Sequence, residues 1–155
     1  MKIASSKKSS SGFTLIELLV VIGILAVLLA ITLIAINPAR QFAQANNTKR
    51  ASDVNAILNA IGQYAADNKG LLPAAITATP TEIRGTAGGA DLCPTLMTQY
   101  LAGIPVDPQT NNGDPVTTCN NTYLTNYWVS RSAADSRVTV TAPGAQLSQT
   151  ISVTR

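Results

Sequence analysis

GFTLIELLVVIGILAVLLAITLIAI, residues 12–36, is the stretch of sequence that decides the fold. Within it, residues 13–36 form one apolar run of 24 residues whose only charged side chain is Glu17. As a helix at about 1.5 Å per residue, this run spans about 36 Å, which is enough to cross a hydrocarbon core of about 30 Å. A secretory signal has a shorter apolar core of about 7 to 15 residues. The run therefore predicts a membrane-spanning helix.

The residues before the apolar run are polar and basic. Residues 1–12 carry Lys2, Lys7 and Lys8 and no acidic side chain. The whole chain has 11 basic and eight acidic residues, so its net charge of +3 comes from this short flank. Because basic flanks stay in the cytoplasm, we expect residues 1–12 inside and the remainder of the chain outside. A nucleic-acid partner is not expected, since no basic patch remains.

A second helical pattern of a different kind follows Asn37 and Pro38, which mark either a kink or a boundary at the membrane surface. Residues 37–70 predict an amphipathic helix that ends near Gly70. Its apolar face comprises Val54, Ile57, Leu58, Ile61, Tyr64 and Ala65. Its charged and polar residues lie mostly on the other face: Arg40, Lys49, Arg50, Asp53, Asn59 and Asp67. One side of this helix should therefore dock on a globular domain.

The remaining residues predict a loop region and then a small sheet. Residues 71–121 are rich in turn formers and read mainly as loop, with one short helix near 94–101. Residues 122–155 predict antiparallel strands at 122–130, 137–142 and 148–154. The aromatic residues Tyr123, Tyr127 and Trp128 lie on the first of these strands, where alternation should place most of them in the core. The fold class is therefore α+β.

Cys93 and Cys119 are the only cysteines, and the chain has no histidine. In an exported domain this pair is expected to form a disulfide, while in a cytosolic protein both could stay as free, buried thiols. The usual nucleophile–base and metal constellations are missing, so we expect no catalytic residue and no cofactor. A membrane-anchored enzyme or sensor, built on Ser-Lys or carboxylate chemistry, stays as a distant alternative.

Glu17 poses a physical problem, because an acid in a membrane helix costs roughly 2.5 to 3.5 kcal/mol at the centre of the bilayer. The apolar run contains no cation that could pair with it. Cleavage after Gly12 would create a charged amine on Phe13, one turn away on the same subunit or on a staggered neighbour. In a low dielectric this amine would attract Glu17 strongly, and a pair between neighbours would fix their register.

The order of Gly12-Phe13-Thr14-Leu15-Ile16-Glu17, the apolar run and the basic leader resembles the class III signal of type IV prepilins. Pseudopilins of type II secretion and DNA-uptake systems use the same signal. The resemblance implies that a membrane prepilin peptidase cuts after Gly12 and N-methylates Phe13, and that Glu17 is the assembly carboxylate. It also implies the lollipop fold of these proteins, in which a long N-terminal helix packs on a small antiparallel sheet.

The resemblance further implies the function and the partners. The chain would be a subunit of a type IV pilus or similar filament, held in the cytoplasmic membrane before assembly and at the cell surface afterwards. Its partners would be other copies, the prepilin peptidase, an assembly ATPase with a platform protein, and minor pilins. The alternative is a pseudopilin, because YLAGIPVDP at 100–108 is similar to a Leu-Pro-x-Asp-Pro stretch of major pseudopilins.

Two features of the chain differ from the pattern of that family. Many members carry a proline a few residues before the position of Pro38, and residues 13–37 contain none. Major pseudopilins bind calcium in a late loop rich in acids. Here Asp107, Asn111, Asn112 and Asp114 are oxygen-bearing and close in sequence, which suits a hard cation. A hydrophilic turn without metal is the preferred interpretation of these four residues.

Overall fold

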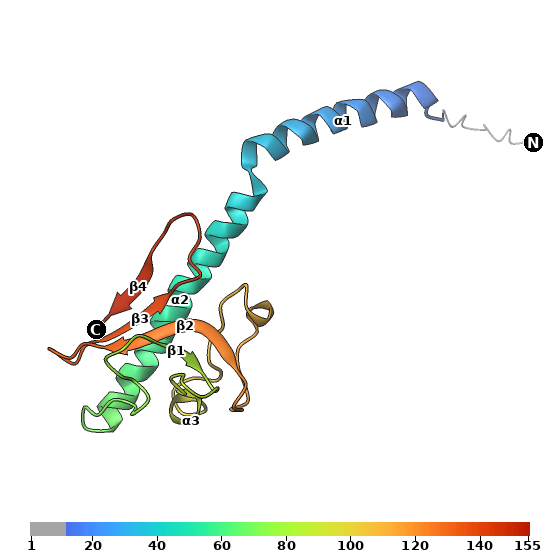
Figure 1. Ribbon diagram of the computed structural model, residues 1–155. Coiled ribbons are helices and arrows are strands. Elements are labelled where there is room, and N and C mark those ends of the chain that lie inside the picture. The colour runs from blue at the N-terminus through green and yellow to red at the C-terminus, as the bar shows by residue number, and fades with distance from the viewer. Residues whose placement is uncertain (1–11) are drawn as a thin grey trace, which may run out of the picture. The chain divides into compact units, whose positions relative to one another are not determined.

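A computed structural model describes residues 12–155, and Figure 1 shows its helices and strands. The predicted leader falls largely on residues 1–11, which lie outside the described residues. The chain divides between Ala39 and Arg40 into two compact units. The first holds helix α1, and the second holds the sheet and nearly all of helix α2.

Helix α1 spans Leu15–Ile36 and begins at the N-cap residue Thr14. It ends at Asn37, whose φ of 47° is left-handed and cannot continue a right-handed helix. Pro38 then begins the next helix, where the missing N–H of proline costs no hydrogen bond. The helix predicted over residues 13–36 is thus present, and its break falls at Asn37 and Pro38.

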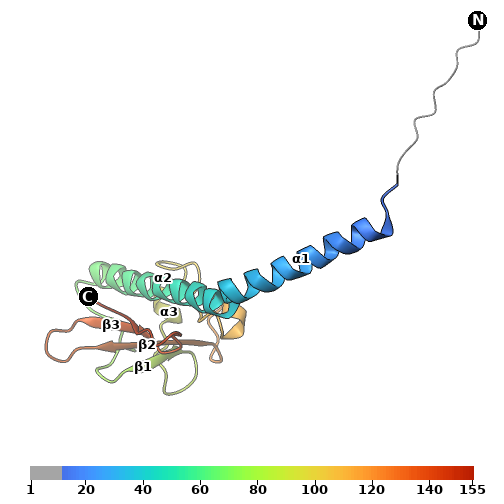
Figure 2. The same cartoon turned by 90° about the horizontal axis from the view of Figure 1, so that it is seen from above.

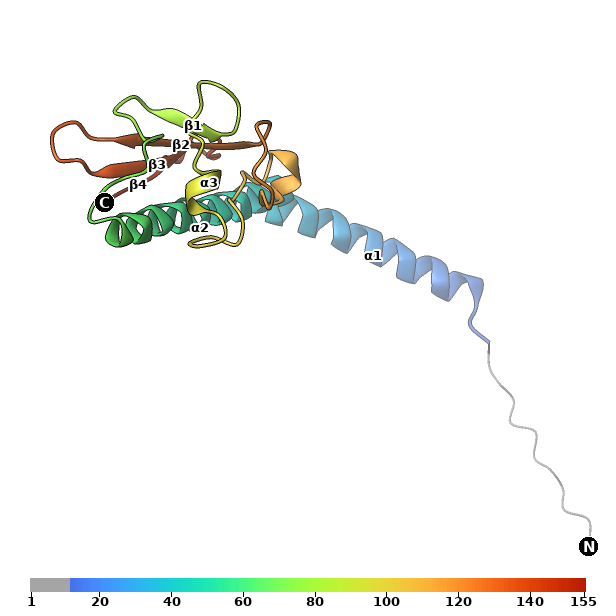
Figure 3. The same ribbon diagram turned by 90° about the horizontal axis from the view of Figure 1, so that it is seen from below.

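Helix α2 spans Pro38–Asp67 and packs on a four-stranded antiparallel sheet. The strands are β1 Thr81–Arg84, β2 Leu124–Arg131, β3 Val138–Ala142 and β4 Ile151–Thr154, and they pair in chain order. Figures 2 and 3 show α2 running along one side of this sheet. The architecture is therefore α+β, as the sequence predicts, and the three predicted strands correspond to β2, β3 and β4.

The core lies between α2 and the inner face of the sheet. The predicted apolar face of α2 contributes Val54, Ile57, Leu58 and Ile61, all buried. The inner face contributes Tyr127, Val129, Val138 and Val140 from β2 and β3. Along β2 the alternation buries every second residue, so Tyr127 is inside while Trp128 is 38% exposed on the outer face. Most of the aromatic cluster is core, as predicted.

Two local predictions in residues 71–121 were wrong. Strand β1 lies where only loop was predicted, because four residues are too short to show a periodicity and it pairs with the distant strand β2. The predicted short helix is present as α3, but its predicted end was wrong, because α3 covers only Cys93–Leu96 instead of 94–101. Met97 is extended, with ψ 150°, and Thr98 has a left-handed φ of 72°, so the helix cannot reach Gly103.

The placement of two charged residues on the outer face of α2 was also wrong. Arg50 is fully buried and Asp53 is 9% exposed. The Tyr127 hydroxyl donates a hydrogen bond of 2.8 Å to the Asp53 carboxylate, and Lys49 forms an ion pair with the same carboxylate at 3.1 Å. Burial and the neighbouring Asp53 raise the pKa of Tyr127. Arg50 lies four residues before Val54 and seven before Ile57, so it belongs to the buried face of α2 and not to the polar one.

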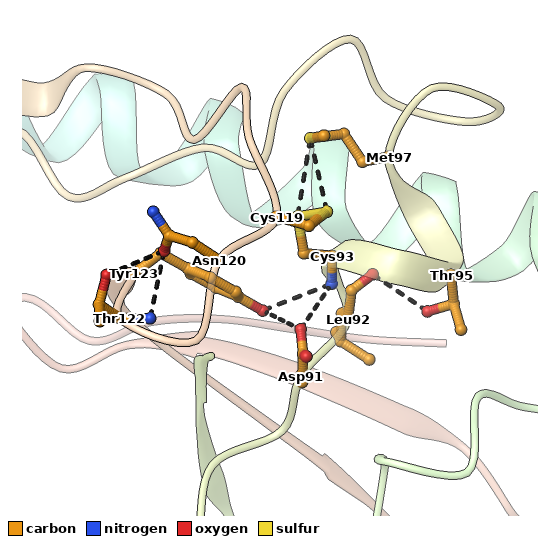
Figure 4. Close-up of a disulfide and its surroundings, with 9 residues drawn as sticks. All are labelled: Asp91, Leu92, Cys93, Thr95, Met97, Cys119, Asn120, Thr122 and Tyr123. Atoms are coloured by element: carbon orange, nitrogen blue, oxygen red, sulfur yellow. Dashed lines mark hydrogen bonds between the residues drawn. A yellow bond between two sulfur atoms is a disulfide. The ribbon is translucent and has the colours of Figure 1, made fainter. Parts of the chain in front are cut away.

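A disulfide joins Cys93, the first residue of α3, to Cys119 in the loop before β2 (Figure 4). The two Cα atoms are 5.5 Å apart. The Met97 sulfur lies 3.6 Å from the Cys93 sulfur and 3.9 Å from the Cys119 sulfur. On the other side, the Asp91 carboxylate accepts from the Cys93 amide and from the Tyr123 hydroxyl, at 3.2 and 2.7 Å. The disulfide therefore fixes the loop between α3 and β2 to the buried first residue of α3.

Replacing both cysteines with serine is expected to lower the free energy of unfolding by about 3 kcal/mol, because the crosslink no longer restricts the unfolded loop of 26 positions. Urea unfolding of the full chain in detergent micelles, followed by tryptophan fluorescence, measures this loss. Wild-type protein treated with a reductant is the matched control, and its reduction is verified by mass. An unchanged urea midpoint in both samples would contradict the expectation.

Candidate processing and assembly site

The junction between Gly12 and Phe13 precedes the first turn of α1. Gly12, Phe13 and Thr14 are all exposed and non-helical, and the Phe13 side chain is 85% exposed. A peptidase needs an accessible backbone that is free of helical hydrogen bonds, and this junction meets both conditions. The predicted cleavage site therefore lies on exposed, non-helical backbone.

Glu17 forms a reciprocal capping box with Thr14 at the start of α1. The Glu17 carboxylate oxygen Oε2 accepts from the Thr14 amide at 2.8 Å and from the Thr14 hydroxyl at 2.7 Å. The Thr14 hydroxyl in turn accepts from the Glu17 amide at 3.3 Å. Such an arrangement satisfies N–H groups that the first turn of a helix leaves without partners. Glu17 thus has a local role that the sequence analysis missed.

The capping box has a direct bearing on processing. The Thr14 amide belongs to the peptide bond between Phe13 and Thr14, so cleavage after Gly12 would leave it intact. Both hydrogen bonds go to Oε2, and within residues 12–155 no hydrogen bond reaches Oε1 of Glu17. A carboxylate that is held in place through one oxygen can offer the other to a cation. The Thr-x-x-Glu spacing was the sequence signal for this arrangement.

The surface of α1 is apolar all round. Its most apolar window of 18 residues has a mean hydropathy of 3.2, and none of its side chains is buried. By length and composition, it is the one helix in the described part of the chain that could cross a membrane. A surface of this kind is not stable in water alone, because burial of apolar area is the main favourable contribution to folding and association. It needs either lipid or other apolar helices around it.

The four candidate calcium ligands lie in different surroundings, one buried and three exposed. Both carboxylate oxygens of Asp107, which is fully buried, accept hydrogen bonds from Arg50. Asn111 and Asn112 lie in the exposed 3₁₀ turn Asn111–Gly113, and Asp114 follows it, also exposed. Across residues 12–155 there is no group of three or more His, Cys, Asp or Glu that could hold a metal ion. Asp107 is thus already bound by Arg50, while the other three candidates lie in or next to an exposed turn.

Residues 7–33 match the family model of the prokaryotic N-terminal methylation motif. No curated protein and no solved structure matches the chain. The matched motif covers Gly12, Phe13, Glu17 and most of α1. The chain therefore carries the class III signal of type IV pilins and pseudopilins.

The motif supports a pilin-like or pseudopilin precursor. It implies processing by a prepilin peptidase and handling by pilus assembly machinery. It also marks structural pilin-like proteins. Together with the apolar helix α1, it indicates membrane anchoring before assembly into an extracellular filament.

Proposed function

We propose that this chain is the precursor of a structural subunit of a type IV pilus or a similar extracellular filament. The observation that carries the proposal is the fully exposed, apolar helix α1, which begins within the methylation motif. A chain that served only as a membrane anchor would need the same hydropathy but not the Gly12-Phe13 junction and the acid at position 17. The disulfide-bonded domain supports a location outside the cytoplasm.

Processing would remove residues 1–12 and methylate the new amino group of Phe13. The precursor would insert with its basic leader in the cytoplasm and its folded domain outside. After cleavage, the Phe13 amine would carry a positive charge at the start of α1. We propose that this amine pairs with Oε1 of Glu17 on a neighbouring subunit, while Oε2 stays bonded to Thr14.

The pairing would set the register between neighbouring subunits. Cohesion itself would come from the apolar surface of α1, which copies of the chain bury against one another outside the membrane. Inside the bilayer this contribution disappears, because lipid tails are as apolar as the helix. Subunits must therefore be extracted by work from outside the chain. An assembly ATPase and its platform protein would supply that work, and minor pilins would be further partners.

The intact mass of subunits from sheared surface filaments tests the proposal. We expect residues 13–155 with one added methyl group and with two hydrogens fewer for the disulfide. Filaments whose subunits retain residues 1–12 would contradict it. So would an anchored monomer in cells that assemble filaments from other subunits.

A pseudopilin of a type II secretion or DNA-uptake system is the second candidate. The tract Ile104–Pro108 favours it through its similarity to the pseudopilin stretch, and Asp107 of that tract forms a buried ion pair with Arg50. Long surface filaments that contain this chain would support a pilin. Short periplasmic fibres, with loss of protein export or DNA uptake on deletion, would support a pseudopilin.

A further inference from the structure

Arg50 is a fully buried charged residue in the middle of α2. A guanidinium group has five N–H donors, and all five are used here. Nε and Nη2 donate to the two carboxylate oxygens of Asp107, at 2.7 and 3.0 Å. The other donors reach side-chain amide oxygens of Asn47 at 3.0 Å, Gln109 at 2.8 Å and Gln146 at 3.3 Å. The positive charge therefore sits inside a complete shell of five oxygens.

The five oxygens come from three separate segments of the chain. Each segment also has hydrogen bonds that do not involve Arg50. Asn47 is on α2, Asp107 and Gln109 follow the loop residue Val106, and Gln146 is in the loop between β3 and β4. The Asp107 amide donates to the Thr125 carbonyl on β2 at 3.0 Å. The Gln146 amide donates to Asn47 Oδ1 at 2.9 Å, and Asn47 donates back to the Gln146 carbonyl at 2.8 Å. The shell is therefore held in place by more than the arginine.

Gly144 shows how closely the loop after β3 covers the ion pair. A Cβ atom added at this glycine would lie 2.7 Å from Asp107 Oδ2 and 3.5 Å from Arg50 Nη2. The first distance is shorter than any normal contact of a Cβ atom. A side chain at position 144 would push the carboxylate away from the arginine. The absence of a side chain there is thus a part of how the site is built.

The shape of the shell suits a planar cation and not a spherical one. Its oxygens lie 2.7 to 3.3 Å from three different nitrogens that are spread over the fork of the guanidinium. A calcium ion needs six to eight oxygens at about 2.3–2.6 Å from one point. The two oxygens of Asp107 bind Nε and Nη2, while the three amide oxygens bind the remaining N–H groups of Nη1 and Nη2. A single metal ion could not contact all five.

We propose that these five oxygens form a cation site whose ligand is the chain's own guanidinium, so that the loops around Asp107 and Gln146 are held on α2 without a metal ion. Such a site has two consequences. Removal of divalent ions should leave the folded domain as stable as before. Truncation of Arg50 should leave a pocket with one negative charge that accepts a free alkylguanidinium ion. This inference concerns the folded domain and does not depend on the filament proposal.

The test compares the thermal midpoints of full-length wild type, Arg50→Ala and Arg50→Lys in detergent micelles. Each protein is measured with EDTA, with calcium chloride, with ethylguanidinium chloride and with sodium chloride at the same ionic strength. We expect Arg50→Ala to lose about 10 °C or more. Ethylguanidinium should restore a large part of that loss and should leave the wild type unchanged. Calcium should act no better than sodium on any of the three proteins.

Arg50→Lys keeps the charge but replaces the planar fork with three donors on one nitrogen, so it should also be less stable than wild type. If Arg50→Ala does not fold alone, its refolding yield with and without ethylguanidinium becomes the measurement. The proposal is overturned if ethylguanidinium rescues no more than sodium chloride does. It is also overturned if calcium rescues Arg50→Ala better than ethylguanidinium, if EDTA destabilises the wild type, or if Arg50→Lys matches the wild type.

Discussion

Replacing Glu17 with alanine is expected to abolish filament growth while leaving the removal of residues 1–12 largely intact. The cleavage site at Gly12 and Phe13 is exposed and lies before the helix, so it should not depend on the Glu17 side chain. Assembly should depend on it, because the mutant offers no anion to the Phe13 amine of a neighbour. The intact mass of the membrane-held subunit measures processing. Electron microscopy and the yield of sheared filaments measure assembly.

Two further variants separate the charge of Glu17 from its capping role. Glu17→Gln can still accept the hydrogen bonds from Thr14 but carries no charge, so we expect it to fail in assembly as Glu17→Ala does. Thr14→Ala keeps the charge and loses the capping hydroxyl, at a cost of about 0.5–2 kcal/mol to the helix. We expect it to assemble. Filaments of normal length from Glu17→Gln would show that the capping box, and not ion pairing, is what assembly requires.

The elements that could be predicted from the sequence are those whose signal is local. The apolar run sets α1 through its length, and Asn37 with Pro38 sets its end. The amphipathic spacing sets α2, and alternation of β-branched and aromatic residues sets β2, β3 and β4. In each case the information lies within one turn or a few residues of the element itself.

The features that could not be predicted depend on partners far along the chain. Arg50 is charged and was therefore predicted on the polar side of α2, although it lies four residues before Val54, on the buried face. Its ion-pair partner Asp107 is 57 positions away, and Gln146 is 96 positions away. Strand β1 is similar, since four residues become a strand only through their pairing with β2. Helical spacing places Arg50 on the buried face, but it does not show which distant residues bind it, nor which strand β1 pairs with.

At the candidate site, by contrast, the feature that the sequence analysis missed is a local one. Glu17 was singled out as an acid that needs a cation, and its first partners in the structure are the amide and hydroxyl of Thr14. The Thr-x-x-Glu spacing that produces this capping box was visible in the sequence. The capping box depends on the Thr14 hydroxyl, which carries no charge, so the search for a cation partner does not find it. The capping hydrogen bonds use Oε2 of Glu17, and the proposed ion pair with a neighbour's Phe13 amine would use Oε1, so the two roles are compatible.

Replacing Asp107 with alanine is expected to lower the free energy of unfolding by about 3–5 kcal/mol, because it leaves the buried Arg50 charge without its counter-ion. Urea unfolding of the full chain in micelles at neutral pH measures the loss. Asp114→Ala is the matched control, since Asp114 is an exposed acid in the neighbouring turn and should change stability by about 0.5 kcal/mol or less. Equal effects of the two substitutions would show that the Arg50–Asp107 pair contributes nothing specific.

The pH dependence of this loss identifies its origin. Burial acts to raise the pKa of the Asp107 carboxyl, but hydrogen bonds from Arg50 and the Gln109 amide, with the charge of Arg50, hold that pKa below its ordinary value. The stabilisation is therefore fully present above the unfolded pKa of about 3.9, and it is lost as the pH falls through the lower pKa of the folded state. We expect the stability difference between wild type and Asp107→Ala to stay constant from neutral pH down to about pH 5 and to shrink below about pH 4. A difference that does not change with acid would mean that alanine acts through lost packing, and not through the charge that Arg50 requires.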